Sequence, residues 1–203
     1  MKKLTKILAA VAAAAMLLST AVSAADAKTH TVVYGDTFWK IAVKYQVGCS
    51  EIIAANPQIK NPDLIYPGQV LTVPETDDAV RAYETEVIRL VNEIRRQYGL
   101  NELTENWELS RVARYKSQDM HDKGYFSHTS PTYGTPFEMM KSFGLTYRSA
   151  GENIAYGYRT PQQVVNGWMN SSGHRANILN SFYTQIGVGY VAAGNYWTQM
   201  FIG

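Results

Sequence analysis

Cysteine is almost absent from the chain, because Cys49 is the only one among its 203 residues. A single thiol cannot form a disulfide within the chain, so stability has to come from side-chain packing or from association. We expect Cys49 itself to be a small buried apolar side chain between two helices. No cysteine follows it, and this absence excludes a thiol nucleophile for the larger, C-terminal part of the sequence.

Long apolar runs are equally scarce, and the one candidate lies at the N-terminus. Basic residues open the chain, an apolar stretch follows at residues 7–18, and small residues offer cleavage after Ala24 or Ala27. This order is typical of a signal peptide, which we place at residues 1–27. The stretch is short for a bilayer span, so we favour cleavage over the alternative of a retained membrane anchor. The sequence thus predicts a secreted protein, extracellular or associated with the cell wall, without a membrane partner after cleavage.

Clusters of basic side chains are missing as well. Removal of the predicted signal peptide after Ala24 takes three lysines away, which leaves 16 basic side chains against 17 acidic ones and a net charge of −1. No block of lysine or arginine remains that could follow a phosphate backbone, so we expect no nucleic-acid partner. About 175 residues remain, which is enough for one small module and one ordinary domain.

Residues 28–74 contain the pattern of a small module with the order strand, helix, helix, strand. A short strand is predicted at residues 31–34, and apolar residues recur at helical spacing from Phe38 onward. A second helix ends before Pro57, because proline removes a backbone donor and clashes with the preceding turn. A turn of tyrosine, proline, glycine and glutamine then leads into a second strand at residues 70–73.

Three separated motifs in this block resemble a LysM module: YGDTFWKIA at residues 34–42, AANP at 54–57 and IYPGQVL at 65–71. The resemblance implies binding of N-acetylglucosamine-containing glycans, peptidoglycan or chitin, in a shallow groove between the loops that flank the helices. The residues that it places at this groove are Gly35, Asp36, Thr37, Phe38, Asn56, Pro57, Ile65 and Tyr66. From the residues alone, the alternative is that the glycine belongs to a turn and the phenylalanine to the core.

A short acidic linker at residues 75–79 separates this module from a domain at residues 80–203, which combines helices with a terminal hairpin. Apolar periodicity and proline or glycine boundaries predict helices at residues 80–98, 107–122 and 135–143 and from Pro161 onward. Between residues 186 and 202, apolar residues alternate with small ones around a turn, which predicts a β-hairpin. Helices first and strands last, without βαβ alternation, indicate an α+β fold in which helices enclose a sheet.

Two of the four histidines, His128 and His174, lie in polar, glycine- or serine-rich surroundings, and Glu152 lies between them. Each of the three is next to turn-forming residues, so we expect loops to aim their side chains into one site. Spacings of 24 and 22 residues exceed what a single helix could bring together. Their convergence is therefore a hypothesis about tertiary structure.

The sequence motifs around these residues resemble those of the bacterial branch of the CAP superfamily: FSH at residues 126–128, GENIA at 151–155 and WMNSSGHRANIL at 168–179. The resemblance implies an α-β-α sandwich with a central cleft, in which two histidines and two glutamates of eukaryotic members can hold a divalent metal. His128, Glu152 and His174 match three of those positions, whereas Ser171 stands where the second glutamate is expected. The resemblance therefore makes the three matching residues candidate ligands of a metal such as zinc, with weakened binding and no obligatory cofactor.

Three classes of function fit this sequence. In the first, the LysM module holds the protein on peptidoglycan while the cleft binds a ligand or partner. In the second, the cleft is a hydrolase site for wall or peptide bonds, either through a metal-bound water with Glu152 as ligand or base, or through Ser127 or Ser171 beside a histidine. In the third, the protein is an assembly factor of the cell wall or spore coat. We place binding or assembly ahead of catalysis, because a fold carries no proof of chemistry.

Overall fold

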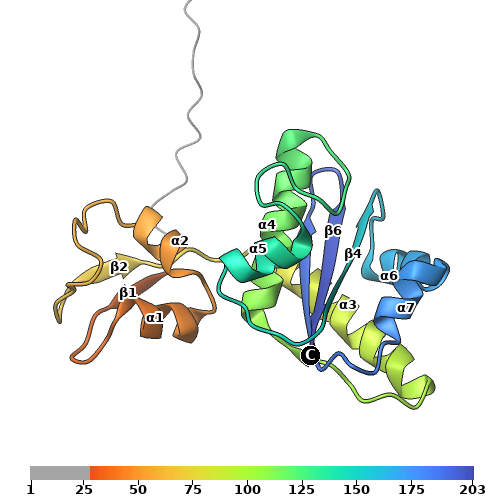
Figure 1. Ribbon diagram of the computed structural model, residues 1–203. Coiled ribbons are helices and arrows are strands. Elements are labelled where there is room, and N and C mark those ends of the chain that lie inside the picture. The colour runs from red at the N-terminus through yellow and green to blue at the C-terminus, as the bar shows by residue number, and fades with distance from the viewer. Residues whose placement is uncertain (1–27) are drawn as a thin grey trace, which may run out of the picture.

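The computed structural model describes residues 28–203, so the predicted signal peptide lies outside the described residues. Figure 1 shows two bodies joined by a short connection, a small N-terminal module and a larger C-terminal domain. Among the described residues, no helix is both long enough and apolar enough to cross a membrane. The predicted order of a βααβ module followed by an α+β domain is what the structure shows.

The N-terminal module pairs two short antiparallel strands, β1 (Thr29–Thr31) and β2 (Val70–Thr72), beside the helices α1 (Phe38–Tyr45) and α2 (Cys49–Ala54). The first strand begins two residues and ends three residues before the predicted one, and after it the Asp36 carboxylate accepts the N–H of Val33 in the turn. Thr37 caps α1 by accepting the N–H of Lys40. Cys49 is half-buried at the start of α2, rather than fully buried between the helices as predicted.

One apolar cluster fills the module, with Ile41, Ile52 and Leu71 nearly inaccessible at its centre. The carboxamide of Asn56 is buried below the helices, where it donates to the carbonyls of Ile52 and Thr72 and accepts the N–H of Thr72. Because a buried amide needs all these partners, Asn56 ties the end of α2 to β2. The module therefore holds its two ends together without a disulfide.

The C-terminal domain is a three-layer sandwich around a four-stranded sheet of order β3-β5-β6-β4, with β3 parallel to β5 and the other neighbours antiparallel. Its elements are α3 (Asp78–Gln97), β3 (Thr104–Glu105), α4 (Trp107–Lys123), α5 (Pro136–Ser142), β4 (Ala150–Tyr156), α6 (Pro161–Met169), α7 (Ser172–Ile178), β5 (Gln185–Val191) and β6 (Tyr196–Ile202). Helices α4 and α5 cover one face of the sheet, and α3, α6 and α7 cover the other (Figure 1). Helix α3 begins inside the predicted linker, because Asp77 caps it.

Two of the three segments that we expected to be loops around the candidate site form regular secondary structure. Glu152 lies in the strand β4 and His174 lies in the short helix α7, so only His128 keeps its predicted loop position. The motif around Glu152 contains glycine and asparagine, which disfavour strands, but it pairs with β6 along its whole length. Tertiary pairing thus overrides local propensity in β4.

Helix α4 lies directly on the backbone of β5. A Cβ atom on Gly189 would come within 2.1 Å of the backbone of Ala113 and Arg114, and one on Gly187 within 2.4 Å of the backbone of Leu109 and Ser110. Only glycine permits this approach, which accounts for the alternation of glycine with apolar residues in β5. The close contact fixes α4, and with it the loop that follows α4, relative to the sheet.

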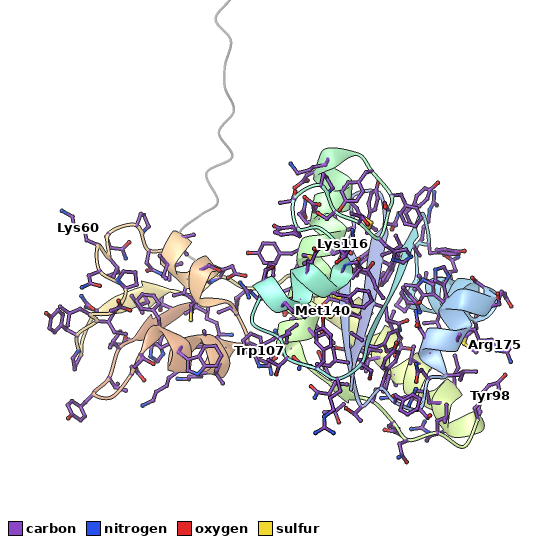
Figure 2. All side chains as sticks on the ribbon, in the orientation of Figure 1. Lys60, Tyr98, Trp107, Lys116, Met140 and Arg175 are labelled. Carbon is purple, nitrogen blue, oxygen red and sulfur yellow. The ribbon has the colours of Figure 1, made fainter. Side chains whose placement is uncertain are left out.

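The two bodies contact each other through a guanidinium group. Arg111 in α4 pairs with Glu51 in α2, with Nη2 2.8 Å from Oε2, and its side chain lies over the rings of Tyr115 and Phe143. Figure 2 places Trp107, one turn earlier on α4, on the side that faces the module. Both carboxylate and guanidinium are about four-fifths buried, with exposed side-chain fractions of 25% and 18%. This ion pair links the module to the helix that supports the cleft described next.

Candidate functional site

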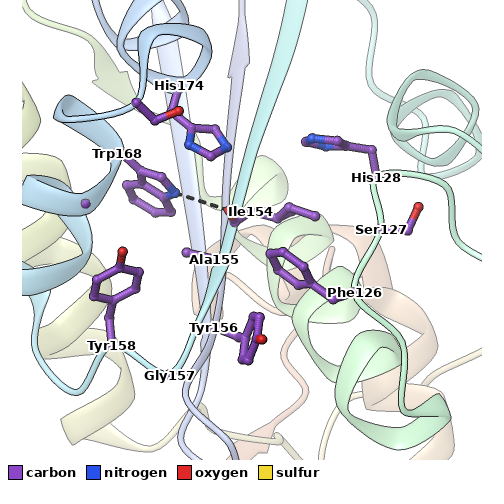
Figure 3. Close-up of a pocket in the computed structure, with 12 residues that line it drawn as sticks. Phe126, Ser127, His128, Ile154, Ala155, Tyr156, Gly157, Tyr158, Trp168 and His174 are labelled. Carbon is purple, nitrogen blue, oxygen red and sulfur yellow. Dashed lines mark hydrogen bonds between the residues drawn. The ribbon is translucent and has the colours of Figure 1, made fainter.

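A cleft of about 800 Å³ lies at the outer edge of β4. One wall comes from the loop after α4, and the opposite wall comes from α6 and the start of α7 (Figure 3). The lining residues are Phe126, Ser127, His128, Ile154, Ala155, Tyr156, Gly157, Tyr158, Gly167, Trp168, Ser171 and His174. The cleft thus joins the two helical layers across the strand that carries Glu152.

The imidazole of His128 is held by a buried carboxylate. Its Nδ1 lies 2.7 Å from Oε1 of Glu152, whose side chain is 2% exposed against 54% for the histidine. Burial raises the pKa of Glu152, and the His128 hydrogen bond and the charge of Lys116 oppose this rise. The second carboxylate oxygen, Oε2, is buried without a hydrogen-bond partner among the described residues. The site therefore contains a His128 ring whose orientation is fixed by Glu152, and a Glu152 oxygen that accepts no hydrogen bond from the described residues.

The loop that carries His128 is fixed from below by Lys116. This lysine is fully buried in α4, and Nζ donates to the carbonyls of Ser127 and His128, at 2.7 and 2.9 Å, and to the hydroxyl of Tyr125. Burial lowers the pKa of Lys116, while the charges of Glu152 and Asp119 oppose this shift. Sequence analysis missed this residue, because a lysine on an amphipathic helix is normally solvated.

A second anchor of the same loop is Asp119, one turn further along α4. Its carboxylate accepts hydroxyl hydrogen bonds from Tyr125, Ser130 and Thr132. Burial raises the pKa of Asp119, but the three hydroxyl donors outweigh it and hold the pKa below its ordinary value. Since both anchors lie on α4, the packing of α4 on the sheet determines where His128 stands.

His174 and Ser171 come from the opposite layer. Both line the cleft, and Figure 3 shows the His174 ring on the other side of the cavity from the His128 ring. Ser171 precedes α7 as its N-cap residue, but its hydroxyl makes no capping hydrogen bond. Burial lowers the pKa of His174, and the neighbouring His128 lowers it further. The structure thus brings all four predicted cleft residues to one cavity or its buried margin.

Aromatic side chains form the rest of the cleft walls. The rings of Phe126 and Tyr156 meet edge to face at 4.7 Å on one side, and Trp168 and Tyr158 line the other. Trp168 belongs to the motif at residues 168–179, whereas Tyr156 and Tyr158 lie outside the motifs of the sequence analysis. The signal that could have identified Tyr156 and Tyr158 is their spacing of two residues, which places both side chains on the same side of an extended chain. Ile178, which lies in the same motif as Trp168, belongs to the domain core.

The fit of a metal was tested on the donor set. Two imidazoles and one carboxylate could in principle bind zinc with a water. In residues 28–203, however, no group of three histidine, cysteine, aspartate or glutamate side chains is placed to hold a metal ion. Glu152 already uses one oxygen on His128, and Ser171 supplies no anionic ligand. The arrangement as it stands in residues 28–203 therefore does not fit a metal centre, and a zinc titration tests the predicted ligand set.

In the N-terminal module, the predicted glycan residues divide into two groups. Phe38 and Asn56 are buried, Phe38 in the apolar cluster and Asn56 in the hydrogen bonds described above, so these two form the framework and not the surface. Asp36 is mostly buried and bonds to His30 Nε2 at 2.8 Å, which makes it a support of its loop. The predicted residues that remain accessible are Gly35, Thr37, Pro57, Ile65 and Tyr66, and Tyr34 beside them is the most exposed aromatic residue.

Comparison with known proteins supports this division into two parts. A model of the cysteine-rich secretory protein family, CAP, matches residues 88–201, and a LysM domain model matches residues 30–74. The Bacillus subtilis protein YkwD is 58% identical over 132 residues, which cover 65% of this chain and 51% of that protein.

A crystal structure of an extracellular SCP-domain protein from Bacillus anthracis superimposes with a TM-score of 0.59 and 35% identity, covering 67% of this chain and 47% of the other. The secreted LysM effector ECP6 of Passalora fulva is 46% identical over 46 residues, which cover 23% of this chain and 20% of that protein. The chain thus spans about half the length, or less, of each of these three proteins. By its larger domain the chain belongs to the cysteine-rich secretory protein (CAP) family, and it carries a LysM domain ahead of that domain.

Proposed function

We propose that this is a secreted binding protein of the cell wall, in which the LysM domain holds an N-acetylglucosamine-containing glycan such as peptidoglycan and the CAP cleft captures a ligand. The observation that carries the proposal is the cleft itself. It is walled by aromatic rings, and one of its lining histidines, His128, is held by the buried carboxylate of Glu152. Such a combination of apolar walls and a few oriented polar groups is typical of a ligand site.

Glycan binding is assigned to the accessible loops of the LysM domain. Tyr34 and Tyr66 expose 96% and 54% of their surface on the two loops that the family resemblance marks. The loop of Tyr34 is held by His30, whose ring bonds to Asp36 and to the hydroxyl of Tyr45. Exposed aromatic rings beside backbone donors suit the apolar face and the acetamido group of the sugar.

Binding accounts for the cleft better than the hydrolase alternatives. In residues 28–203 no serine hydroxyl is hydrogen-bonded to a histidine ring, and Ser127 Oγ instead accepts the N–H of Thr129. No three-ligand metal group is assembled in the same residues. What the cleft does offer is His128 fixed by Glu152 and a second histidine opposite, which can bind polar groups of a ligand whose apolar parts lie on the aromatic walls.

The anchoring part of the proposal is tested with insoluble polymer. Residues 28–203 are incubated with purified peptidoglycan and with chitin, and the bound fraction is measured for the native chain and for a Tyr34→Ala/Tyr66→Ala variant. We expect at least about a tenfold loss of affinity in the variant, as for loss of two aromatic contacts. A Phe182→Ala variant is the matched control, since this exposed ring lies in the other domain. Undiminished binding by the double variant would refute the assignment.

The cleft part is tested separately with soluble fragments released from peptidoglycan. Side-chain NMR signals of His128, His174 and the Trp168 indole are followed during titration. We expect all three to shift together, and we expect Glu152→Ala to abolish the shifts while polymer pull-down by the LysM domain persists. If the fragments bind to the LysM domain and the signals of His128, His174 and Trp168 do not shift, the cleft does not capture this ligand and that part of the proposal is wrong.

A further inference from the structure

The floor of the cleft is the outer edge of an edge strand. Strand β4 ends the sheet, with β6 as its only partner in the described sheet. Lining residues of the cleft come from both helical layers and meet beyond β4, and Figure 3 shows the strand passing between the two walls. Edge strands leave backbone hydrogen-bonding groups unpaired, and proteins normally cover such groups.

The sheet register decides which backbone groups point into the cleft. Ser149 and Gly203 exchange two backbone hydrogen bonds, and Gly157 donates to Asn195. Because hydrogen-bonded pairs alternate in an antiparallel ladder, the odd-numbered residues of β4 face β6. Glu152, Ile154 and Tyr156 therefore direct their N–H and C=O groups away from the sheet.

The protein covers only part of this outer row. The carbonyl of Glu152 accepts the side-chain amide of Asn177 at 3.1 Å, and that of Ile154 accepts the Trp168 indole N–H at 3.4 Å. Within residues 28–203, the N–H groups of Ile154 and Tyr156 have no acceptor. Both residues line the cleft, and the register of the sheet directs these two donors away from β6.

From this we propose that the cleft binds an extended peptide as an added strand on β4. Carbonyl groups on one edge of an extended chain recur every second residue, about 6.8 Å apart, and the N–H groups of Ile154 and Tyr156 have the same spacing. The C=O of Tyr156 can accept one N–H in return. A sugar or a lipid chain has no such repeat of acceptors, so the backbone pattern selects a peptide.

The aromatic walls suit the side chains of such a peptide. Successive side chains of a strand point to opposite faces, and the cleft offers rings on both, Phe126 with Tyr156 on one side and Trp168 with Tyr158 on the other. Tyr156 is 59% exposed, so the slot is open at this end. The inference rests on the proposed function, because it names the class of ligand that the cleft captures.

The test uses peptides whose backbone edges are blocked by N-methylation. The probe is a capped hexapeptide of alternating valine and threonine, titrated into ¹⁵N-labelled residues 28–203. We expect the amide signals of Ile154 and Tyr156 to shift and their hydrogen exchange to slow. A peptide methylated on every second amide keeps one free edge and binds, whereas one methylated on every amide has none and loses at least about tenfold in affinity.

Variants of the strand supply a second measurement. Tyr156→Ala removes the ring and keeps the N–H, whereas Tyr156→Pro removes both at a position whose N–H does not face β6. We expect the proline variant to bind the hexapeptide more weakly than the alanine variant by about a further tenfold. Native-like spectra of both variants establish that the sheet is intact, and the methylated peptides on the native chain decide the question if either variant unfolds.

Three outcomes would overturn the inference. Equal binding of the fully methylated peptide would show that the backbone edge is not used. A second such outcome is that millimolar hexapeptide causes no shift while wall fragments still shift the His128 and Trp168 signals. The proposed function would then stand, and peptide binding would be refuted. Slow exchange of the same two amides that depends on protein concentration, without peptide, would indicate pairing of β4 with a second copy.

Discussion

The Nδ1 atom of His128 lies 2.7 Å from the Oε1 atom of Glu152, although 24 residues separate them in the sequence. The carboxylate is buried and the ring is accessible, so the pair connects the interior of the sheet to the cleft. Lys116 fixes the backbone of the same histidine through its carbonyl. The position of the His128 ring therefore depends on two charged groups that the fold buries.

Replacing Glu152 with glutamine should raise the stability of the folded chain at neutral pH. Burial raises the pKa of Glu152 above its ordinary value of 4.5. The folded state therefore holds this proton more tightly than the unfolded state, and stability decreases as the pH rises from 4.5 through the folded pKa. Thermal unfolding at pH 7 should show a higher midpoint for Glu152→Gln. The exposed Glu105→Gln should show no change, and a lower midpoint in Glu152→Gln would contradict the argument.

His174 should make the protein less stable in mild acid. Burial lowers the pKa of His174 below 6.5, and repulsion by His128 adds to this. The unfolded state therefore binds this proton first, so stability decreases as the pH falls below 6.5, which is the opposite sign to Glu152. Unfolding midpoints at pH 7.5, 6.5 and 5.5 should fall less in His174→Asn than in the native chain. Asn101→Ala, an exposed position that carries no titratable group, should keep the native slope.

Lys116→Met should loosen the loop that carries His128. The substitution leaves the carbonyls of Ser127 and His128 without the donor that the buried lysine provides, which costs about 2–4 kcal/mol in the free energy of unfolding. Urea denaturation measures this loss, and hydrogen exchange of residues 125–132 shows where it falls. Lys123→Met on the same helix is the control, since this side chain is exposed. Equal effects of the two substitutions would show that the buried lysine has no special role.

Gly189→Ala should destabilise the domain by about 3 kcal/mol, because its Cβ would lie 2.1 Å from the backbone of α4 and neither element can retreat without losing its packing. Gly173→Ala provides the contrast. Nothing lies within 4 Å of a Cβ at that position, which is inside α7, so alanine should stabilise the helix by about 0.5–1 kcal/mol. Chemical denaturation of both variants checks the pair, and a mild effect at Gly189 would mean that α4 can shift.

Calorimetric titration with zinc should give no saturable heat in the micromolar range. The reason is that the three candidate ligands are not placed as a metal-holding group in residues 28–203, and Ser171 adds no charge. The measurement is repeated at pH 7.5 and 5.5 and on His128→Ala. One-site binding at pH 7.5 that disappears at pH 5.5 and in the variant would restore the metal-dependent hydrolase alternative.

Several features of the protein were determined by the sequence itself. The helices of both domains and the terminal hairpin follow from apolar periodicity and from glycine and proline boundaries, which are local properties of the chain. The motifs around His128, Glu152 and His174 led to the CAP family, and both histidines line the cleft of the structure. The elements that local pattern misplaced were β4 and α7, since glycine and asparagine in β4 are tolerated only because β6 supplies the pairing.

Only the tertiary structure decided how these residues act together. The sequence pattern places Lys116 on the surface of its helix. In the folded chain the loop after α4 covers this side chain, and the carbonyls of Ser127 and His128 accept its hydrogen bonds. The family resemblance places Phe38 and Asn56 at the glycan groove, whereas both side chains are buried in the folded module. The free N–H groups of Ile154 and Tyr156 follow from the strand order, which places β4 at the edge and turns every second residue outward. Burial and pairing are properties of neighbours that lie far away in the chain, so no local pattern could contain them.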